Sequence, residues 1–345
     1  MKKLEESVID FIQKHPHSSS SEILNGVDEK VSLATIKRVL SKLVSSKDLE
    51  LLGRGRGTKY RLSAYYKLFK DVALEEYYKD EIDERDIIED FNFALLDEIL
   101  PNIDIFSAEE IAYLDELQNN FTHNIAQLSP MEITQELERL AIDLSWKSSQ
   151  IEGNTYSLLE TERLLKEKQT ASGKTQQEAT MLLNHKDAID FIIENPSFLH
   201  PISTAKIEDI HSILIKELQV QRNIRKRRVG ISGTNYRPLD NAFQIEDALT
   251  KSCEIINQRN SVFEQAFLSL LLISYIQPFS DGNKRTARIV SNAILLNEKY
   301  CPISFRTVDS IDYKKAMLLF YEQNNITAMK KIFIAQYAFA TKTYF

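Results

Sequence analysis

The stretch from Tyr275 to Arg288, YIQPFSDGNKRTAR, constrains the fold of this chain more than any other. It follows an apolar run, Ala266–Ile276, and Pro278 ends that run because proline cannot continue a helix. Gly282 then allows a tight turn, and the residues that follow Arg285 have the pattern of a new helix. The stretch therefore predicts two helices joined by a short loop.

A loop of this kind enters a helix N-terminus, where unpaired backbone N–H groups and the helix dipole favour an anion. Arg285 and Arg288 are three residues apart, so both guanidinium groups share one helix face. Asp281 adds a hard carboxylate oxygen, which suits a Mg²⁺ ion shared with a nucleotide phosphate. The pattern indicates a nucleotide site; the alternative is an ordinary helix–loop–helix with solvated charges.

These residues resemble the Fic-family signature, His-Pro-Phe-x-Asp/Glu-Gly-Asn-Gly-Arg-x-x-Arg. The matched positions are Pro278, Phe279, Asp281, Gly282, Asn283, Arg285 and Arg288, whereas Gln277 replaces the histidine and Lys284 replaces the second glycine. Family members typically transfer AMP from ATP to a hydroxyl side chain of a target protein. The related Doc branch, which often has lysine where this chain has Lys284, transfers a phosphate instead.

The resemblance implies ATP and Mg²⁺ as cofactors and a target protein with a Tyr, Ser or Thr hydroxyl as partner. By this resemblance, the catalytic residues are Gln277, Asn283, Arg285 and Arg288, and Asp281 holds the metal. The nucleotide-binding residues are Asp281, Gly282, Asn283, Lys284, Arg285 and Arg288, together with Thr234 and Tyr236 from a segment described below.

The two departures affect the chemistry itself. Gln277 is an amide and cannot take the proton from the attacking hydroxyl, and losing a general base costs roughly 10² to 10⁴ in rate. A glutamine can still orient a nucleophile by hydrogen bonding. Lys284 adds a point charge and a bulkier side chain where a glycine would let the backbone approach a phosphate. AMP transfer and phosphate transfer both remain open.

A helical stripe begins near Met131 and ends at Ser148-Ser149-Gln150-Ile151-Glu152-Gly153. Ser148 and Glu152 lie four residues apart on one helix face, and Gly153 is a plausible C-cap. The six residues resemble the Fic autoinhibitory motif, Ser/Thr-x-x-x-Glu-Gly/Asn, on a helix at about 135–153. By that resemblance Glu152 pairs with Arg288 and repels the terminal phosphate of ATP. The alternative is a capped helix whose Glu152 is solvated.

The segment RKRRVGISGTNYRP, residues 225–238, has strand-type residues around two glycines. It resembles the Fic flap, a short β-hairpin at about 228–238 that aligns the target peptide by strand addition. Its basic run, residues 225–228, is either a solvated face or a contact with the target or a phosphate. His185 and His211 lie inside apolar repeats, where a histidine is usually a satisfied core residue.

Residues 1–63 read as three short helices followed by a hairpin, which together resemble a winged helix-turn-helix. Segment 32–46 would be the recognition helix, and a Gly-Arg-Gly-Arg-Gly tip would form the wing. This segment holds twelve Lys and Arg against eight Asp and Glu. The predicted contacts with duplex DNA are Thr35, Lys37, Arg38, Lys42, Arg54 and Arg56. The alternative is a winged helix used for protein contact or for homodimer formation.

Composition bounds the remaining choices. The formal net charge of the 345 residues is −7, so the chain as a whole is no general nucleic-acid binder. With two cysteines, neither a disulfide framework nor a cysteine zinc site is supported. No run approaches the length of a membrane span, and the start lacks a signal-peptide core, so we expect a cytoplasmic protein with no membrane contact.

The sequence thus predicts a mainly α protein, with an all-helical Fic-domain core at 131–345 that carries a small β-hairpin flap. An acidic helical connector at 64–130 would join it to an N-terminal α/β winged-helix domain at 1–63. The first functional hypothesis is an autoinhibited Fic-type adenylyltransferase (AMPylation) or phosphotransferase, weakened by Gln277. The second is a catalytically inert ATP sensor that regulates transcription through the winged helix.

Overall fold

The structure is a computed structural model that describes residues 2–345, apart from the side chains of Lys2 and Arg56. The chain divides into two compact units, which are described separately. The first contains residues 1–72 and 323–327, and the second contains residues 73–322 and 328–345. None of the helices in the described part of the chain is long and apolar enough to cross a membrane.

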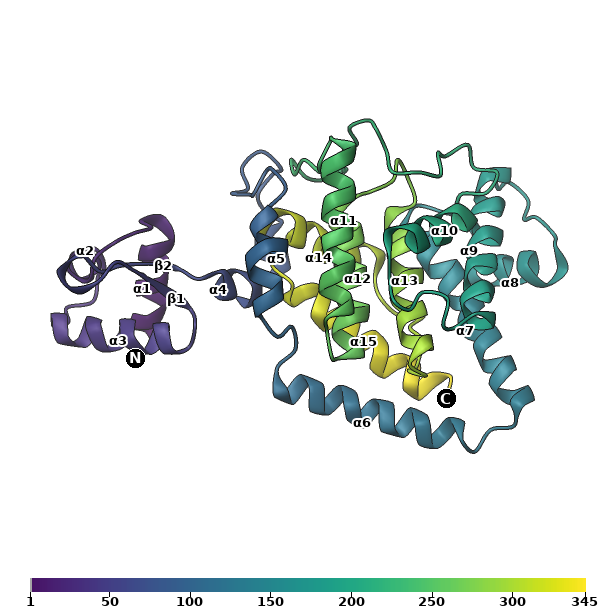
Figure 1. Ribbon diagram of the computed structural model, residues 1–345, viewed down its shortest axis with the longest axis horizontal. Coiled ribbons are helices and arrows are strands. Elements are labelled where there is room, and N and C mark those ends of the chain that lie inside the picture. The colour runs from purple at the N-terminus through teal and green to yellow at the C-terminus, as the bar shows by residue number, and fades with distance from the viewer. Residues whose placement is uncertain (1) are drawn as a thin grey trace. The chain divides into compact units, whose positions relative to one another are not determined.

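The first unit is a small α/β arrangement (Figure 1). Its elements are α1 (Lys2–Lys14), α2 (Ser20–Gly26), α3 (Leu33–Ser45), β1 (Leu49–Leu52), η1 (Gly55–Gly57), β2 (Lys59–Leu62) and α4 (Ala64–Phe69). The strands pair antiparallel with Leu49 opposite Leu62. Val8, Ile36 and Leu40 are fully buried in one core cluster that includes Leu49. The predicted order of three helices and a hairpin is therefore confirmed; its identification as a winged helix stays a prediction.

The second unit is almost entirely helical. Its short elements are α5 (Leu74–Tyr77), a π turn η2 (Leu95–Ile99) and a 3-10 turn η3 (Leu100–Asn102). Its longer helices are α6 (Ala108–Ile125), α7 (Pro130–Ile151), α8 (Leu158–Glu167), α9 (Gln176–Glu194), α10 (Thr204–Leu214), α11 (Ala242–Asn257), α12 (Val262–Ile276), α13 (Asn283–Asn297), α14 (Ser310–Gln323) and α15 (Thr327–Thr343). Several begin at Ser or Thr caps followed three residues later by Glu, as at Ser157 and Thr175.

Helix α12 forms the centre of this unit because it is apolar on every side and must be buried all round. It packs against α11 and α13 (Figure 1), and Phe267, Leu270 and Ile273 are almost wholly inaccessible. Its C-cap, Gln277, has a φ of 52°, so the chain reverses there before Pro278. This reversal places the loop 278–282 at the N-terminus of α13.

One predicted feature of secondary structure is wrong. The segment 228–238 contains no strand among its described residues, only a turn at Gly233 and an isolated bridge between Arg237 and Asp90. At its end the segment pairs with a distant part of the chain instead: Arg237 N–H donates to Glu89 O at 2.6 Å. Helix α10 ends at Leu214, and two residues soon after it, Glu217 and Gln219, have positive φ.

Candidate active site

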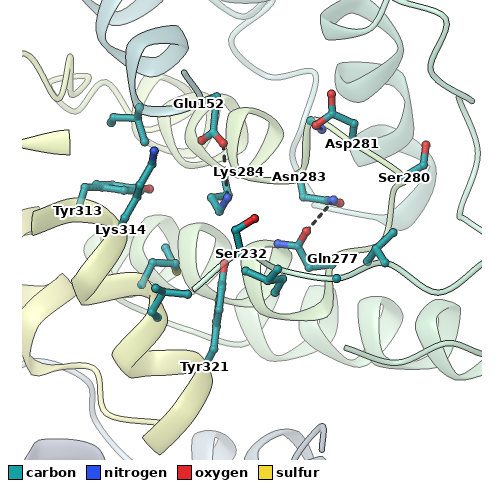
Figure 2. A pocket seen from close by; sticks show the side chains of 17 residues that line it. Glu152, Ser232, Gln277, Ser280, Asp281, Asn283, Lys284, Tyr313, Lys314 and Tyr321 are labelled. Carbon is teal, nitrogen blue, oxygen red and sulfur yellow. Dashed lines mark hydrogen bonds and ion pairs between the residues drawn. The ribbon is translucent and has the colours of Figure 1, made fainter. Parts of the chain in front are cut away.

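A cavity of about 360 Å³ lies where the loop before α13 faces α7 and α14 (Figure 2). Gln277 and residues 280–284 form one side, and Ile151 and Glu152 form another. Residues 229–232 provide a third wall, here called the 229–232 wall. Helix α14 closes the cavity with Tyr313, Lys314, Met317, Leu318 and Tyr321. The lining thus combines charged and polar groups, mainly from the loop and Glu152, with apolar side chains from the 229–232 wall and α14.

The loop is held in shape by Asn283, the first residue of α13. Its Oδ1 accepts from Phe279 N–H at 2.8 Å, and its Nδ2 donates to Phe279 O at 2.9 Å. Gly282 adopts a φ of 81°, which a residue with a side chain would rarely adopt. The result is a tight loop whose backbone leads directly into the helix N-terminus.

Gln277 lines the cavity, and the nitrogen and the oxygen of its carboxamide each form a hydrogen bond. Its Nε2 donates to Ser274 O at 2.6 Å, and its Oε1 accepts from Asn283 Nδ2 at 3.0 Å, as Figure 2 shows. Its side chain is nearly buried. An amide in this position has no basic site, so it can orient a hydroxyl but cannot remove its proton.

Arg285 and Arg288 lie beneath the loop with 1% and 0% of their surface exposed. Arg285 Nη2 contacts Asp281 Oδ2 at 3.2 Å, and Arg288 stacks its guanidinium 5.3 Å above the Tyr313 ring. The Nη1 atoms of both arginines have no hydrogen-bond partner among the described residues. Unsatisfied buried donors are costly, so these N–H groups fit an anion such as a phosphate.

Glu152 occupies the end of α7 and faces two cations. Its Oε1 accepts from Arg288 Nη2 at 2.7 Å, and its Oε2 lies 3.4 Å from Lys284 Nζ. Burial acts to raise the pKa of Glu152, but Arg288 and Lys284 together hold it down at about 2. The carboxylate is therefore ionised at neutral pH, and the predicted ion pair with Arg288 is present.

Ser148, one turn earlier on α7, contacts the same arginine. Arg288 Nε donates to Ser148 Oγ at 2.8 Å, and Nη2 donates to Ser148 O at 3.0 Å. His185 Nε2 lies 2.6 Å from Ser148 Oγ, and burial together with Arg288 keeps the pKa of His185 well below its usual range. Gly153 has a φ of 99° and ends the helix as expected.

Asp281 is the carboxylate predicted to hold a metal, and 65% of its side chain is exposed. Its Oδ1 accepts from Gly282 N–H at 2.6 Å, so the carboxylate is held at the loop. No group of three His, Cys, Asp or Glu in the described residues could hold a metal alone. One carboxylate facing an anion site fits a Mg²⁺ that takes its other ligands from phosphate and water.

Two residues predicted to bind the nucleotide lie elsewhere. Tyr236 is 2% exposed, its hydroxyl donates to Tyr275 O at 3.1 Å, and its ring stacks on Tyr275. Thr234 Oγ1 accepts from Tyr236 N–H at 3.1 Å. Neither residue is among the described ones that line the cavity, and the buried Arg285 and Arg288 are not among them either. Tyr236 is a core residue because its large ring gains more by packing than by facing solvent.

Several residues of the site carried little signal in the sequence. His211 stacks on Phe279 with ring centroids 3.6 Å apart, and its Nε2 contacts Asp281 O at 3.0 Å. Burial lowers the pKa of His211. Its apolar neighbours correctly indicated a core position, but the spacing alone could not indicate contact with the loop. The cavity residue Lys314 belongs to no motif, and Ser232 was not singled out within the 228–238 segment.

In the first unit, Ser32 Oγ accepts from Thr35 N–H, so Thr35 is bound into the start of α3. Lys37 and Arg54 are exposed. Lys42 Nζ pairs with Glu5 at 2.6 Å and Arg38 is exposed on α3, whereas the side chain of Arg56 lies outside the described residues. Lys37 and Arg54 are suited to a test because they place one exposed cation on the predicted recognition helix and one on the predicted wing.

Comparison with known proteins points to one family. Residues 201–295 match the Fic/DOC family, and this span contains the loop and most of α13. The "Protein adenylyltransferase Fic" of Nematostella vectensis is 27% identical over 232 residues, covering 62% of this chain and 51% of that protein. The "Protein adenylyltransferase fic-1" of Caenorhabditis elegans is 26% identical over 161 residues, covering 44% and 31%. The chain thus spans about half the length, or less, of these curated relatives.

A solved structure of a Fic-1 fragment from C. elegans has the same fold. It superposes with a TM-score of 0.60 at 18% identity, covering 69% of this chain and 72% of that one. At this identity the likeness concerns the fold and not the chemistry. The family match, the relatives and the loop geometry agree: the chain contains a Fic/DOC family domain.

Proposed function

We propose that the chain is a Fic-type protein that binds ATP with Mg²⁺ and transfers AMP, or a related phosphate group, to a protein hydroxyl. The unpaired buried Nη1 atoms of Arg285 and Arg288 beneath a loop at a helix N-terminus carry this proposal. The names of the relatives, which are protein adenylyltransferases, support AMP as the transferred group. The apolar lining side chains of the 229–232 wall and of α14 suit a nucleotide base.

Asp281 is the residue that would hold the metal, together with phosphate oxygens. Mg²⁺ bound there would neutralise charge on the phosphates. Lys284 lines the cavity beside Glu152 and adds a further positive charge close to the phosphates. A lysine ammonium in this place can shift the position of the chain of phosphates, so the choice between AMP and phosphate transfer depends on this residue.

Glu152 restrains the protein in this proposal. Its contact with Arg288 uses a donor that a terminal phosphate would need, and its charge repels that phosphate. Ser148 holds the same arginine from the next turn of α7. A nucleotide that binds with its phosphates on Arg288 must therefore displace Glu152 first.

Gln277 makes the transfer slow. The attacking hydroxyl would reach the cavity beside the Gln277 amide, which offers it a hydrogen bond but no proton acceptor. Positioning and charge stabilisation supply much of the catalysis in phosphoryl and nucleotidyl transfer, so a residual rate is expected.

The experiment is incubation of the full chain with cell lysate and ATP labelled at the α- or the γ-phosphate. Transfer of α-label to protein bands supports AMP transfer, and transfer of γ-label supports phosphate transfer. The matched control is Arg285→Ala, which removes the buried guanidinium from the phosphate site. Labelling that persists unchanged in this variant would contradict the proposed site.

A second candidate function is an ATP sensor without catalysis that binds duplex DNA through the first unit. It is favoured by Gln277, whose carboxamide is engaged on both sides and has no base character. The exposed Lys37 of α3 and Arg54 of the hairpin turn supply charges for phosphate contacts. Tight ATP binding without label transfer, together with DNA affinity that changes with ATP, would support the sensor.

A further inference from the structure

Arg225 begins the chain segment that carries the 229–232 wall, and it is 2% exposed. A buried guanidinium usually pairs with a carboxylate. Among the described residues, the side chain of Arg225 instead donates to backbone carbonyl oxygens: Nε to Gln277 O at 2.6 Å, Nη1 to Arg227 O at 2.9 Å, and Nη2 to Leu239 O. Its backbone N–H also donates to Pro278 O at 3.0 Å.

These contacts join three parts of the chain. Leu239 O lies beyond the wall, Arg227 O lies before it, and Gln277 O belongs to the loop that follows α12. Through Arg225, hydrogen bonds connect the two ends of the wall segment to each other and to Gln277, which stands where the Fic signature has its histidine. A planar guanidinium with donors in three directions can do this, whereas a lysine ammonium cannot reach three separate carbonyls.

The neighbouring basic residues are arranged differently. Lys226, Arg227 and Arg228 are exposed, and Arg228 forms a surface pair with Asp240 at 3.1 Å. A pair of this kind contributes little to stability. The basic run is therefore not one functional unit: its first residue is buried within the fold, and the other three are available to solvent.

The wall contributes apolar side chains to the cavity. Val229 and Ile231 line it together with Met317 and Leu318 of α14. Ser232 extends towards Gln277 (Figure 2). The groups proposed to bind the phosphates come from another part of the chain, the N-terminus of α13 with its buried arginines.

We propose that Arg225 is a positioning residue for the nucleotide: it holds the 229–232 wall, with its apolar side chains, against the cavity and fixes the backbone of Gln277. The inference rests on the proposed nucleotide site. The role of Arg225 affects the nucleoside part and the phosphate part of ATP differently. Loss of Arg225 weakens binding of the nucleoside part and leaves binding of the phosphates nearly unchanged.

The test compares ATP with inorganic tripolyphosphate, which has only the phosphate part. Both are titrated by calorimetry into the full chain carrying Glu152→Gly, which opens the phosphate site, with Arg225→Lys or Arg225→Ala added. Arg222→Ala is the matched control, because Arg222 lies three residues earlier and its side chain forms an exposed pair with Asp209.

We expect Arg225→Lys and Arg225→Ala to weaken ATP binding about tenfold, which is the loss of one modest apolar contact surface, and to change tripolyphosphate binding less than about twofold. Guanidinium ion at low concentration should restore ATP binding by Arg225→Ala, whereas sodium ion should not. An equal loss for both ligands, or no loss for either, would overturn the proposal.

Trypsin gives a second measurement that needs no ligand. The exposed residues Lys226, Arg227 and Arg228 are cleavage sites next to the wall. Both Arg225 variants should be cut there faster than the Arg222→Ala control, and unchanged cleavage would contradict the role of Arg225. If the parent chain binds neither ligand, the proposed function fails, and the trypsin rates alone decide the role of Arg225.

Discussion

Replacing Glu152 with glutamine removes one charge from the candidate active site and keeps the size of the side chain. The carboxylate lies 2.7 Å from Arg288 Nη2 and 3.4 Å from Lys284 Nζ. In the proposed function, a terminal phosphate that binds Arg288 must replace this carboxylate as the partner of Arg288. The carboxylate also repels the phosphate. Glu152→Gln should therefore raise the affinity for ATP.

The magnitude follows from the electrostatics of the pair. Burial would raise the pKa of Glu152, yet Arg288 and Lys284 lower it to about 2 from an ordinary 4.5. That difference corresponds to about 3 kcal/mol in favour of the ionised form. The amide keeps a neutral hydrogen bond to Arg288 of about 1 kcal/mol. We expect a net gain in ATP binding of about 1–2 kcal/mol, or roughly 5- to 30-fold in affinity.

Titration calorimetry with Mg²⁺ and ATP would measure this on the wild type, on Glu152→Gln and on Glu138→Gln. Glu138 is an exposed residue of the same helix and serves as the matched control. AMP is the second ligand, because it lacks the terminal phosphates that Glu152 repels. An unchanged ATP affinity, or an equal gain for AMP and ATP, would refute the reasoning.

Four further outcomes are expected. Gln277→His should add a proton acceptor that raises the transfer rate by up to about 10²–10⁴. When Gln277→His is combined with Glu152→Gly, the gain in auto-modification by α-labelled ATP should exceed the product of the two single effects. A double variant that binds ATP but transfers no AMP would exclude an AMP-transferring pocket. Asp281→Asn should weaken ATP binding in calorimetry with Mg²⁺ but not with EDTA, and equal loss in both would remove the metal from Asp281. In the full chain, Lys37→Ala with Arg54→Ala should reduce affinity for duplex DNA and flatten its salt dependence by up to about two phosphate contacts; a wild type without salt-dependent binding would remove this interface. Because the pKa of Glu152 is lowered, its contribution to stability should be complete above pH 4.5 and vanish as the pH falls through about 2, so the melting temperatures of wild type and Glu152→Gln should converge in acid.

The local parts of the site could be predicted from the sequence because they depend on short spacings. Arg285 and Arg288 share a helix face because they are three residues apart, and Ser148 and Glu152 do so because they are four apart. In the structure both Ser148 and Glu152 contact Arg288. Helix starts followed Ser and Thr caps for the same reason, since a cap acts on the residues beside it.

The rest depends on contacts between distant residues, and no local pattern encodes those. Arg225 stands in a run of four basic residues, and only the fold distinguishes it as the buried one. Tyr236 follows the cavity-lining residues 229–232 closely in the sequence, but its ring stacks on Tyr275 in the core. The expected hairpin at 228–238 is absent from the described residues, and Arg237 of that segment instead pairs with the distant residues Glu89 and Asp90.

The first compact unit is discontinuous in the chain, and this matters for any attempt to dissect the protein. Residues 323–327, between α14 and α15, belong to it. Asn325 Nδ2 donates to Lys67 O at 3.0 Å and to Lys70 O at 2.8 Å, and Ile326 N–H donates to Leu68 O at 3.0 Å. A fragment ending at residue 72 would lose these donors and leave three carbonyls of its last turn unpaired. Domain deletions made by a single cut are thus poor controls for this protein, and point variants of the intact chain are the cleaner tools.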